Sequence, residues 1–151
     1  MMSDLTAAAI DLLKDLIGIP SFSSQEDKTA DRIGEWFDHY GIPYQRDGNN
    51  LWAKNKAFDS KKPTLLLNSH HDTVKPNAAY TNDPFEAKIE DGKLYGLGSN
   101  DAGGALVSLI ALFTHYFNKE NPKYNLLVTA SAEEEIAGDD SLSGLLPMLP
   151  K

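Results

Sequence analysis

The 151-residue sequence contains no cysteine, which excludes both disulfide bridges and thiolate metal sites. Any metal that the chain binds must therefore be held by nitrogen and oxygen atoms of His, Asp and Glu. Basic residues are also few, because 14 Lys and Arg stand against 22 Asp and Glu and leave a formal net charge of −8. Since nucleic acids and anionic membrane surfaces are bound through basic patches, we expect neither as a partner.

Long apolar runs are lacking as well, so the sequence predicts no membrane-spanning segment. The N-terminal segment has no basic region, and Asp11 interrupts its apolar stretch, so we expect no secretory signal and a cytoplasmic location. What the sequence does contain, 41% hydrophobic and 24% charged residues, is typical of a globular domain.

Apolar periodicity and turn signals predict alternating helices and strands. Helices are expected over 3–17, where Ser3 is the cap, from a Ser24–Asp27 capping box to Gly41, and over about 102–119. Strands are expected over 44–46 and 51–53, joined by a turn, over 65–67, over 87–89 and 93–95 as a second hairpin, and over 124–130.

The first candidate site follows the apolar run Leu65–Leu67, which is typical of a buried strand. If the chain stays extended beyond this run, His70 and Asp72 share one face and His71 points to the other. A carboxylate that accepts the second N–H of a metal-bound imidazole orients the ring and makes it more basic. The alternative is a surface turn of hydrated polar residues.

A second candidate lies in the glycine-dense segment 96–104, where Asp101 precedes a long apolar helix. The segment lacks the Gly-Lys-Ser/Thr of a phosphate loop, and its glycine spacing does not fit the dinucleotide motif. We expect these glycines to let the backbone approach a neighbour closely, with Asp101 directed inward. The alternative for Asp101 is an ordinary helix N-cap.

The third candidate is the run Glu133–Glu135, which directly follows the apolar strand expected over 124–130. An acidic run is commonly a solvated face. Here it emerges from a buried strand, which is where α/β proteins gather their ligands. His39 is expected to face solvent and His115 to be structural.

Together the three segments resemble the M20 family of dinuclear zinc peptidases and deacylases. The motifs that carry the resemblance are Ser69-His70-His71-Asp72-Thr73-Val74, Tyr95-Gly96-Leu97-Gly98-Ser99-Asn100-Asp101, and Glu133-Glu134-Glu135-Ile136-Ala137-Gly138, with Asp83-Pro84-Phe85 and Asp91-Gly92 between them. The resemblance covers nearly the whole chain. It implies an α/β fold with a mixed sheet and flanking helices, and hydrolysis of an amide bond.

The resemblance also implies a role for each residue of the site. His70 is expected to bind one zinc ion, Asp101 to bridge two, and Glu135 to bind the other. Glu134 is expected to be the general base and Asp72 to orient His70. The adjacent glutamates would differ because neighbouring residues of an extended chain point opposite ways. Co²⁺ and Mn²⁺ accept the same ligand types as Zn²⁺.

Departures from the family pattern bear on the substrate. Ser69 stands where glycine is usual, Leu97 where arginine is often seen, and no Lys-Gly-Gly follows Asp101. These features resemble the acetylornithine deacetylase-like branch and imply an N-acyl amino acid such as N-acetyl- or N-succinylornithine. Dipeptidase, carboxypeptidase and succinyl-diaminopimelate desuccinylase activities stay open. So does a regulatory or interaction domain without catalysis, and a nucleotide-binding domain is a third class.

Family members are more than twice as long as this chain. We therefore expect residues 1–151 to be the N-terminal part of a catalytic domain, with little or no activity alone. A further acidic ligand, a late histidine and a lid or dimerisation domain are expected outside these residues. The complete protein would be a homodimer through that domain.

Overall fold

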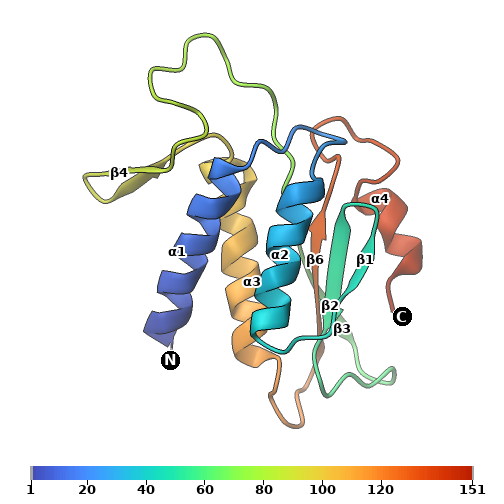
Figure 1. Ribbon diagram of the computed structural model, residues 1–151. Helices are drawn as coiled ribbons and strands as arrows, with labels where there is room; N and C mark the ends of the chain where they lie inside the picture. Colours follow the sequence, from blue (N-terminus) through green and yellow to red (C-terminus); the bar gives the residue numbers. More distant parts are fainter. Residues whose placement is uncertain (1, 151) are drawn as a thin grey trace.

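A four-stranded mixed sheet organises the computed structural model, which describes residues 2–150 (Figure 1). Its strand order is β1-β2-β6-β3, with β1 Gln45–Asp47, β2 Asn50–Lys54, β3 Thr64–His70 and β6 Asn125–Ser131. β2 pairs antiparallel with β1 and β6, whereas β3 and β6 are parallel. The strands lie within one or two residues of their expected positions, except that β3 extends three residues further, to His70.

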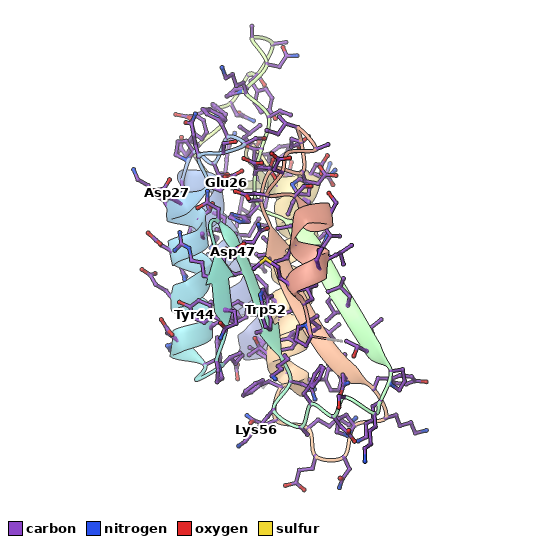
Figure 2. The ribbon with its side chains drawn as sticks, turned by 90° about the vertical axis from the view of Figure 1, so that its right-hand side faces the viewer. Glu26, Asp27, Tyr44, Asp47, Trp52 and Lys56 are labelled. Carbon is purple, nitrogen blue, oxygen red and sulfur yellow. The ribbon has the colours of Figure 1, made fainter. Side chains whose placement is uncertain are left out.

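Three helices cover one face of the sheet: α1 Met2–Gly18, α2 Asp27–His39 and α3 Gly104–Tyr116 (Figure 1). Side-chain alternation along the strands separates two apolar clusters. Leu51 and Val128 belong to the large cluster beneath the three helices. Trp52 and Leu127 point to the opposite face, where they meet the short C-terminal helices α4 Leu142–Leu145 and η2 Leu146–Met148 (Figure 2). The α/β fold with a mixed sheet and flanking helices is thus confirmed.

The two ends of α2 differ in how well the sequence predicts them. Gly41 terminates the helix as expected, because its φ of +62° suits glycine and its N–H bonds the carbonyl of Asp38. The predicted capping box at Ser24 is wrong. The residue that precedes the first turn is Glu26, whose side chain does not cap the helix. Ser24 itself has a φ of +68° and lies in a loop.

The expectation that residues 65–67 form a buried strand is also wrong, since β3 is an edge strand. Leu65 is 53% exposed, and the strand is buried only at Ser69 and His70. The strand therefore becomes buried at the end that carries the polar motif. A run of leucines is common to edge and central strands, so the sequence did not distinguish them.

The helix expected from residue 102 begins later. Residues Ser99–Gly103 form a separate π-type turn, and α3 starts at Gly104. Likewise α1 begins at Met2, so Ser3 lies inside its first turn. β4 Lys88–Glu90 and β5 Lys93–Tyr95 form the second expected hairpin, which projects away from the main sheet (Figure 1). No helix within residues 2–150 is long and apolar enough to cross a membrane.

Candidate metal centre

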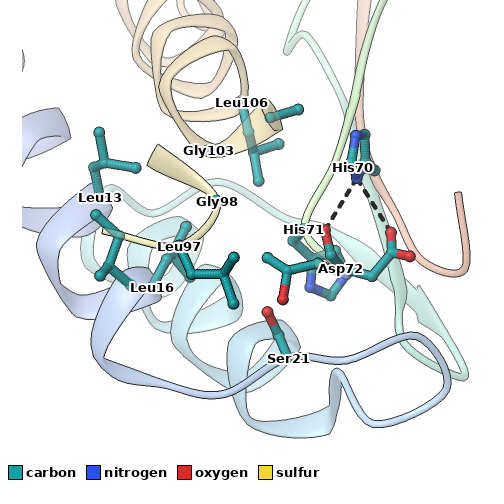
Figure 3. Close-up of a pocket in the computed structure, with 13 residues that line it drawn as sticks. Leu13, Leu16, Ser21, His70, His71, Asp72, Leu97, Gly98, Gly103 and Leu106 are labelled. Carbon is teal, nitrogen blue, oxygen red and sulfur yellow. Dashed lines mark hydrogen bonds and ion pairs between the residues drawn. The ribbon is translucent and has the colours of Figure 1, made fainter. Parts of the chain in front are cut away.

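The parallel pairing of β3 and β6 brings two of the three predicted segments together. His70 is in register with Ser131, so Asp72 and the Glu133–Glu135 run both emerge from the same end of the sheet. This is the end at which open α/β sheets commonly bind ligands. α3 makes the crossover between the two strands, and the glycine-rich turn before it forms the third side (Figure 3).

Close packing against α1 explains the glycines of this turn. A Cβ atom at Gly103 would lie 2.7 Å from Leu13 Cδ1 and 2.6 Å from the carbonyl oxygen of Gly98. Gly98 has a φ of +77°, which L side chains rarely adopt. The close approach expected from the sequence is therefore found, and the neighbours are protein atoms of α1 and of the turn itself.

His70 lies at the centre of the site. The residue is only 7% exposed, and a carboxylate lies near each of its two ring nitrogens. Its Nε2 is 3.2 Å from Asp101 Oδ1 and 3.6 Å from Glu134 Oε2. Its Nδ1 lies 3.2 Å from Asp72 Oδ1 (Figure 3). A small cavity of about 20 Å³ beside it is lined by apolar side chains such as Leu13 and Leu106 and by polar residues that include Ser21 and Asp72.

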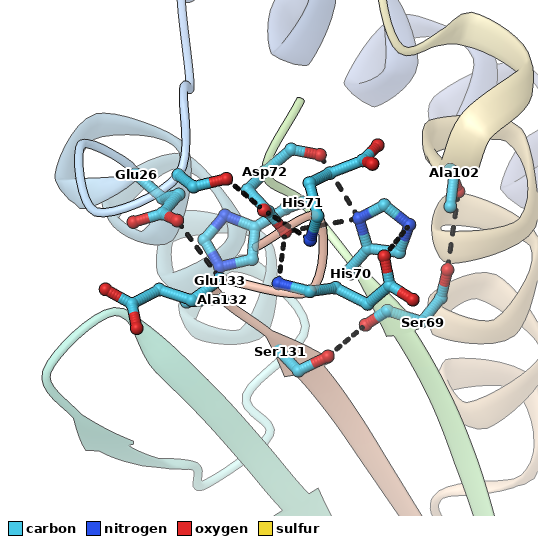
Figure 4. Close-up of polar contacts among 12 residues, drawn as sticks. Glu26, Ser69, His70, His71, Asp72, Ala102, Ser131, Ala132 and Glu133 are labelled. Atoms are coloured by element: carbon cyan, nitrogen blue, oxygen red, sulfur yellow. Dashed lines mark hydrogen bonds and ion pairs between the residues drawn. The ribbon is translucent and has the colours of Figure 1, made fainter. Parts of the chain in front are cut away.

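Asp72 is fully buried and accepts hydrogen bonds from four groups. The His70 ring is one donor, and the Ser23 hydroxyl is a second at 2.7 Å. The main-chain N–H groups of Glu134 and Glu135 are the others, each at 3.1 Å (Figure 4). One carboxylate therefore fixes both the imidazole and the backbone that carries the two glutamates.

Glu134 and Glu135 lie in a turn after β6, so the expectation that an extended chain directs them to opposite sides is wrong. One ligand atom from each of them and one from His70 all lie within 4.8 Å of one another. The side chain of Asp101 is 77% exposed beside them, and it does not cap α3. All five predicted site residues therefore lie around the His70 ring, but the ligand atoms that come together are those of His70, Glu134 and Glu135, whereas Asp101, among these five, contacts His70 alone.

Charge around His70 is strongly negative, and the pKa values reflect it. Burial alone would lower the pKa of His70, but the hydrogen bond and charge of Asp72, together with Glu134 and Asp101, raise it to about 9. Burial would raise the pKa of Asp72, but the hydrogen bonds from His70, Ser23 and the two main-chain amides lower it to about 2. Partial burial and the charge of Asp101 raise the pKa of Glu135.

The other histidines lie outside the cluster. His71 points away from His70 and is buried between α2 and the β1–β2 turn, where its Nδ1 is 2.8 Å from Thr29 Oγ1 and its Nε2 donates to the Asn49 carbonyl. Burial lowers the pKa of His71 to about 4, so it is neutral at pH 7. His39 is exposed as expected, and His115 lies on an exposed position of α3, away from the site.

The donor set fits a divalent metal. One imidazole and several carboxylates supply nitrogen and oxygen ligands of the kind that Zn²⁺, Mn²⁺ and Co²⁺ accept. Cations would also offset the mutual repulsion of Asp101, Glu134 and Glu135. Two contributors to this arrangement, Ser23 and Glu26, were not anticipated, because their partners lie 49 and 107 residues away in sequence.

Comparisons with known proteins show the family of the chain. Residues 66–150 match the family described as peptidase family M20/M25/M40. A succinyl-diaminopimelate desuccinylase of Rhodospirillum centenum is 32% identical over 138 residues, which cover 82% of this chain and 35% of that protein. The chain thus spans about a third of the length of this relative.

Solved structures show the same fold. An M20 family metallo-carboxypeptidase of Sulfolobus solfataricus superposes with a TM-score of 0.73 at 25% identity, over 93% of this chain and 34% of that one. A dinuclear metal binding peptidase of Bacillus subtilis gives a TM-score of 0.70 at 21% identity, over 96% and 40% of the two chains.

Proposed function

This chain belongs to peptidase family M20/M25/M40, and on that premise we propose that it supplies part of the active site of a metal-dependent amide hydrolase. The observation that carries the proposal is the cluster at the end of β3 and β6. There the buried His70 ring, held by Asp72, faces Asp101, Glu134 and Glu135. Three carboxylates that converge on one imidazole offer the nitrogen and oxygen ligands of a divalent-cation site.

We assign His70, Asp101 and Glu135 as metal ligands, with Asp101 as the bridge between two ions because a carboxylate has two oxygens to offer. Asp72 orients His70 by accepting its Nδ1–H, which directs Nε2 toward the site. Two divalent ions at such a site supply a nucleophile at neutral pH and polarise the scissile carbonyl. Zn²⁺ is the proposed native ion, and Co²⁺ or Mn²⁺ suits the same ligands.

Glu134 is the proposed general base. Its carboxylate is half-exposed, with the side chain 54% accessible, and it lies 3.6 Å from His70 Nε2. From this position it accepts a proton from the attacking water and returns that proton to the leaving amine. Its main chain is fixed by Asp72, so the carboxylate acts from a positioned backbone.

The proposed substrate is an N-acyl amino acid. A hollow of about 260 Å³ beside Asp101 and Glu135 is lined by Thr73, Tyr80 and the turn 96–101, and it offers space next to the proposed metal ligands. The motif resemblance favours N-acetyl- or N-succinylornithine. The similarity to a desuccinylase supports succinyl-diaminopimelate as the second candidate. A dipeptide, which the motif resemblance also allows, or a peptide C-terminus is the third candidate, and the similarity to a carboxypeptidase supports it.

We further propose that residues 1–151 are the N-terminal part of the catalytic domain. The support is that the chain spans 35% of the desuccinylase and 34% of the carboxypeptidase. In this proposal the remaining ligands, and the lid domain through which the protein dimerises, belong to sequence outside these residues.

The test has two parts. Titration of the 151-residue chain with Co²⁺, followed by visible absorption, is expected to show binding that Glu135→Gln weakens. In the complete gene product, hydrolysis of N-acetylornithine, N-succinylornithine, succinyl-diaminopimelate and a dipeptide is then measured with and without Glu134→Gln. Activity that survives this substitution would show that Glu134 is not the general base. Hydrolysis of none of the four substrates would favour a non-catalytic domain.

A further inference from the structure

We propose that Glu26 is a positioning residue that sets the Glu133–Glu135 turn against His70; this inference rests on the proposed metal site. Glu26 is fully buried at the residue before α2. It lies behind the site and far from Glu134 and Glu135 in sequence, and none of the three motifs includes it.

The contacts of the Glu26 carboxylate join three separate segments. Oε1 accepts the main-chain N–H of Ser24 at 2.8 Å and that of Glu133 at 3.1 Å. Oε2 accepts the side-chain amide of Asn49 in the β1–β2 turn at 2.9 Å. Within residues 2–150 the carboxylate forms no ion pair, so these N–H donors are what offsets its burial. Figure 2 shows Glu26 close to the turn that follows Asp47.

The bond to Glu133 has a specific consequence for the site. The three consecutive main-chain N–H groups of Glu133, Glu134 and Glu135 are all held by buried carboxylates, the first by Glu26 and the next two by Asp72 (Figure 4). Glu26 thus fixes the start of the turn, and Asp72 fixes its middle.

The backbone at Glu133 needs such support. Its φ of +52° places a residue other than glycine in the left-handed region, which L side chains rarely adopt. The Glu133 side chain also turns away from the metal site, toward the Ser24 hydroxyl and the Asp140 amide. The main-chain N–H of Glu133 is therefore held by Glu26, and its side-chain carboxylate by Ser24 of the same loop. Release of the Glu26 bond would let the turn relax and move the proposed ligand Glu135.

Two substitutions separate the reach of the side chain from its charge. Glu26→Asp keeps the negative charge but is one methylene shorter, so it cannot hold Ser24 and Glu133 together. Glu26→Gln keeps the length, and its carbonyl oxygen can still accept both main-chain N–H groups while the Asn49 amide turns to accept from the new NH₂. Asp27→Asn, at the exposed neighbouring residue, is the matched control.

The experiment is Co²⁺ titration of the 151-residue chain, with visible absorption as the signature of coordination geometry and circular dichroism as the check on folding. Glu26→Asp is expected to weaken Co²⁺ binding about tenfold and to shift the absorption bands, as loss of a supporting contact does at other metal sites. Glu26→Gln is expected to stay within about threefold of the wild-type affinity, and Asp27→Asn to match the wild type.

A folded Glu26→Asp chain with wild-type affinity and spectrum would overturn the proposal. A larger loss in Glu26→Gln than in Glu26→Asp would overturn it too, because charge rather than reach would then be the cause. If the wild-type chain binds no Co²⁺, the proposed function fails first. The role of Glu26 is then read from amide hydrogen exchange at residues 133–135, which Glu26→Asp is expected to accelerate. Unchanged exchange there would refute it.

Discussion

Asp72 Oδ2 accepts the main-chain N–H of Glu135 at 3.1 Å, so the residue proposed to orient one metal ligand also holds the backbone of another. The two residues are far apart in sequence and meet because β3 and β6 are parallel neighbours. A change at Asp72 must therefore affect both sides of the site at once.

Asp72→Asn is expected to lower the free energy of unfolding of the metal-free chain by about 1–3 kcal/mol, because the amide NH₂ cannot accept from the N–H groups that now converge on the carboxylate. Urea unfolding followed by circular dichroism measures this. Asp139→Asn, at an exposed position, is the control and should change stability little. Equal stability of the Asp72 variant and the wild type would contradict the hydrogen-bonding role.

Stability of the metal-free chain should fall as the pH rises above neutrality. The pKa of His70 is raised from 6.5 to about 9 in the folded protein, so its contribution is complete below pH 6.5 and is lost as the pH passes through about 9. The urea midpoint measured in EDTA from pH 6 to 9.5 tests this. His70→Gln should flatten the decline, whereas His39→Gln, at an exposed histidine, should leave it in place.

His71 should produce the opposite trend on the acid side. Its folded pKa is lowered to about 4, so the stability tied to the neutral ring is present above pH 6.5 and is lost as the pH falls from 6.5 toward 4. The same urea series extended to pH 4.5 measures the loss. We expect His71→Gln to weaken this pH dependence and His115→Gln to preserve it. If His71→Gln leaves the loss of stability at acid pH unchanged, that loss is caused by other groups.

Metal binding should strengthen with pH. Because His70 must lose a proton to bind a cation through Nε2, the apparent Co²⁺ affinity should rise about tenfold per pH unit between pH 7 and 8.5. Isothermal titration calorimetry in two buffers of different ionisation enthalpy counts the protons released. Release of no proton would show that His70 is not a ligand or is already neutral.

The two glutamates should separate in their effects. In the complete gene product, Glu134→Gln is expected to lower kcat by about 10²–10⁴-fold with little change in metal content, as for loss of a general base. Glu135→Gln is expected to lower metal content first. Metal analysis beside steady-state kinetics distinguishes them, and a reversed pattern would exchange the roles of these neighbours, whose oxygens lie close together.

The sequence predicted the helices and strands, and which neighbouring side chains share a face, well where the signal is local. Alternation placed His70 and Asp72 together and His71 apart, and the φ requirement of Gly41 marked the end of α2. The prediction that β3 is buried was wrong, because the strand order of the sheet, and not the run of leucines, decides which strand lies at an edge.

The contacts of Glu26 were beyond reach for a related reason. Its bond to Glu133 spans 107 residues and depends on how the β1–β2 turn, α2 and the end of β6 meet. Ser24 and Asp27 have the spacing of a capping box, yet the φ of +68° at Ser24 shows that the chain uses these residues as a loop. Sequence spacing describes neighbours along the chain, whereas the support of this site comes from neighbours in space.

The exposed position of β3 also bears on how the chain behaves in solution. Within residues 2–150 this strand is paired on one side only, and Leu65 and Tyr124 are more than half exposed near its beginning. Open backbone N–H and C=O groups next to apolar side chains form a template for strand pairing between molecules. Self-association of the 151-residue chain should therefore begin at this edge and grow with protein concentration, which favours dilute samples for the metal titrations.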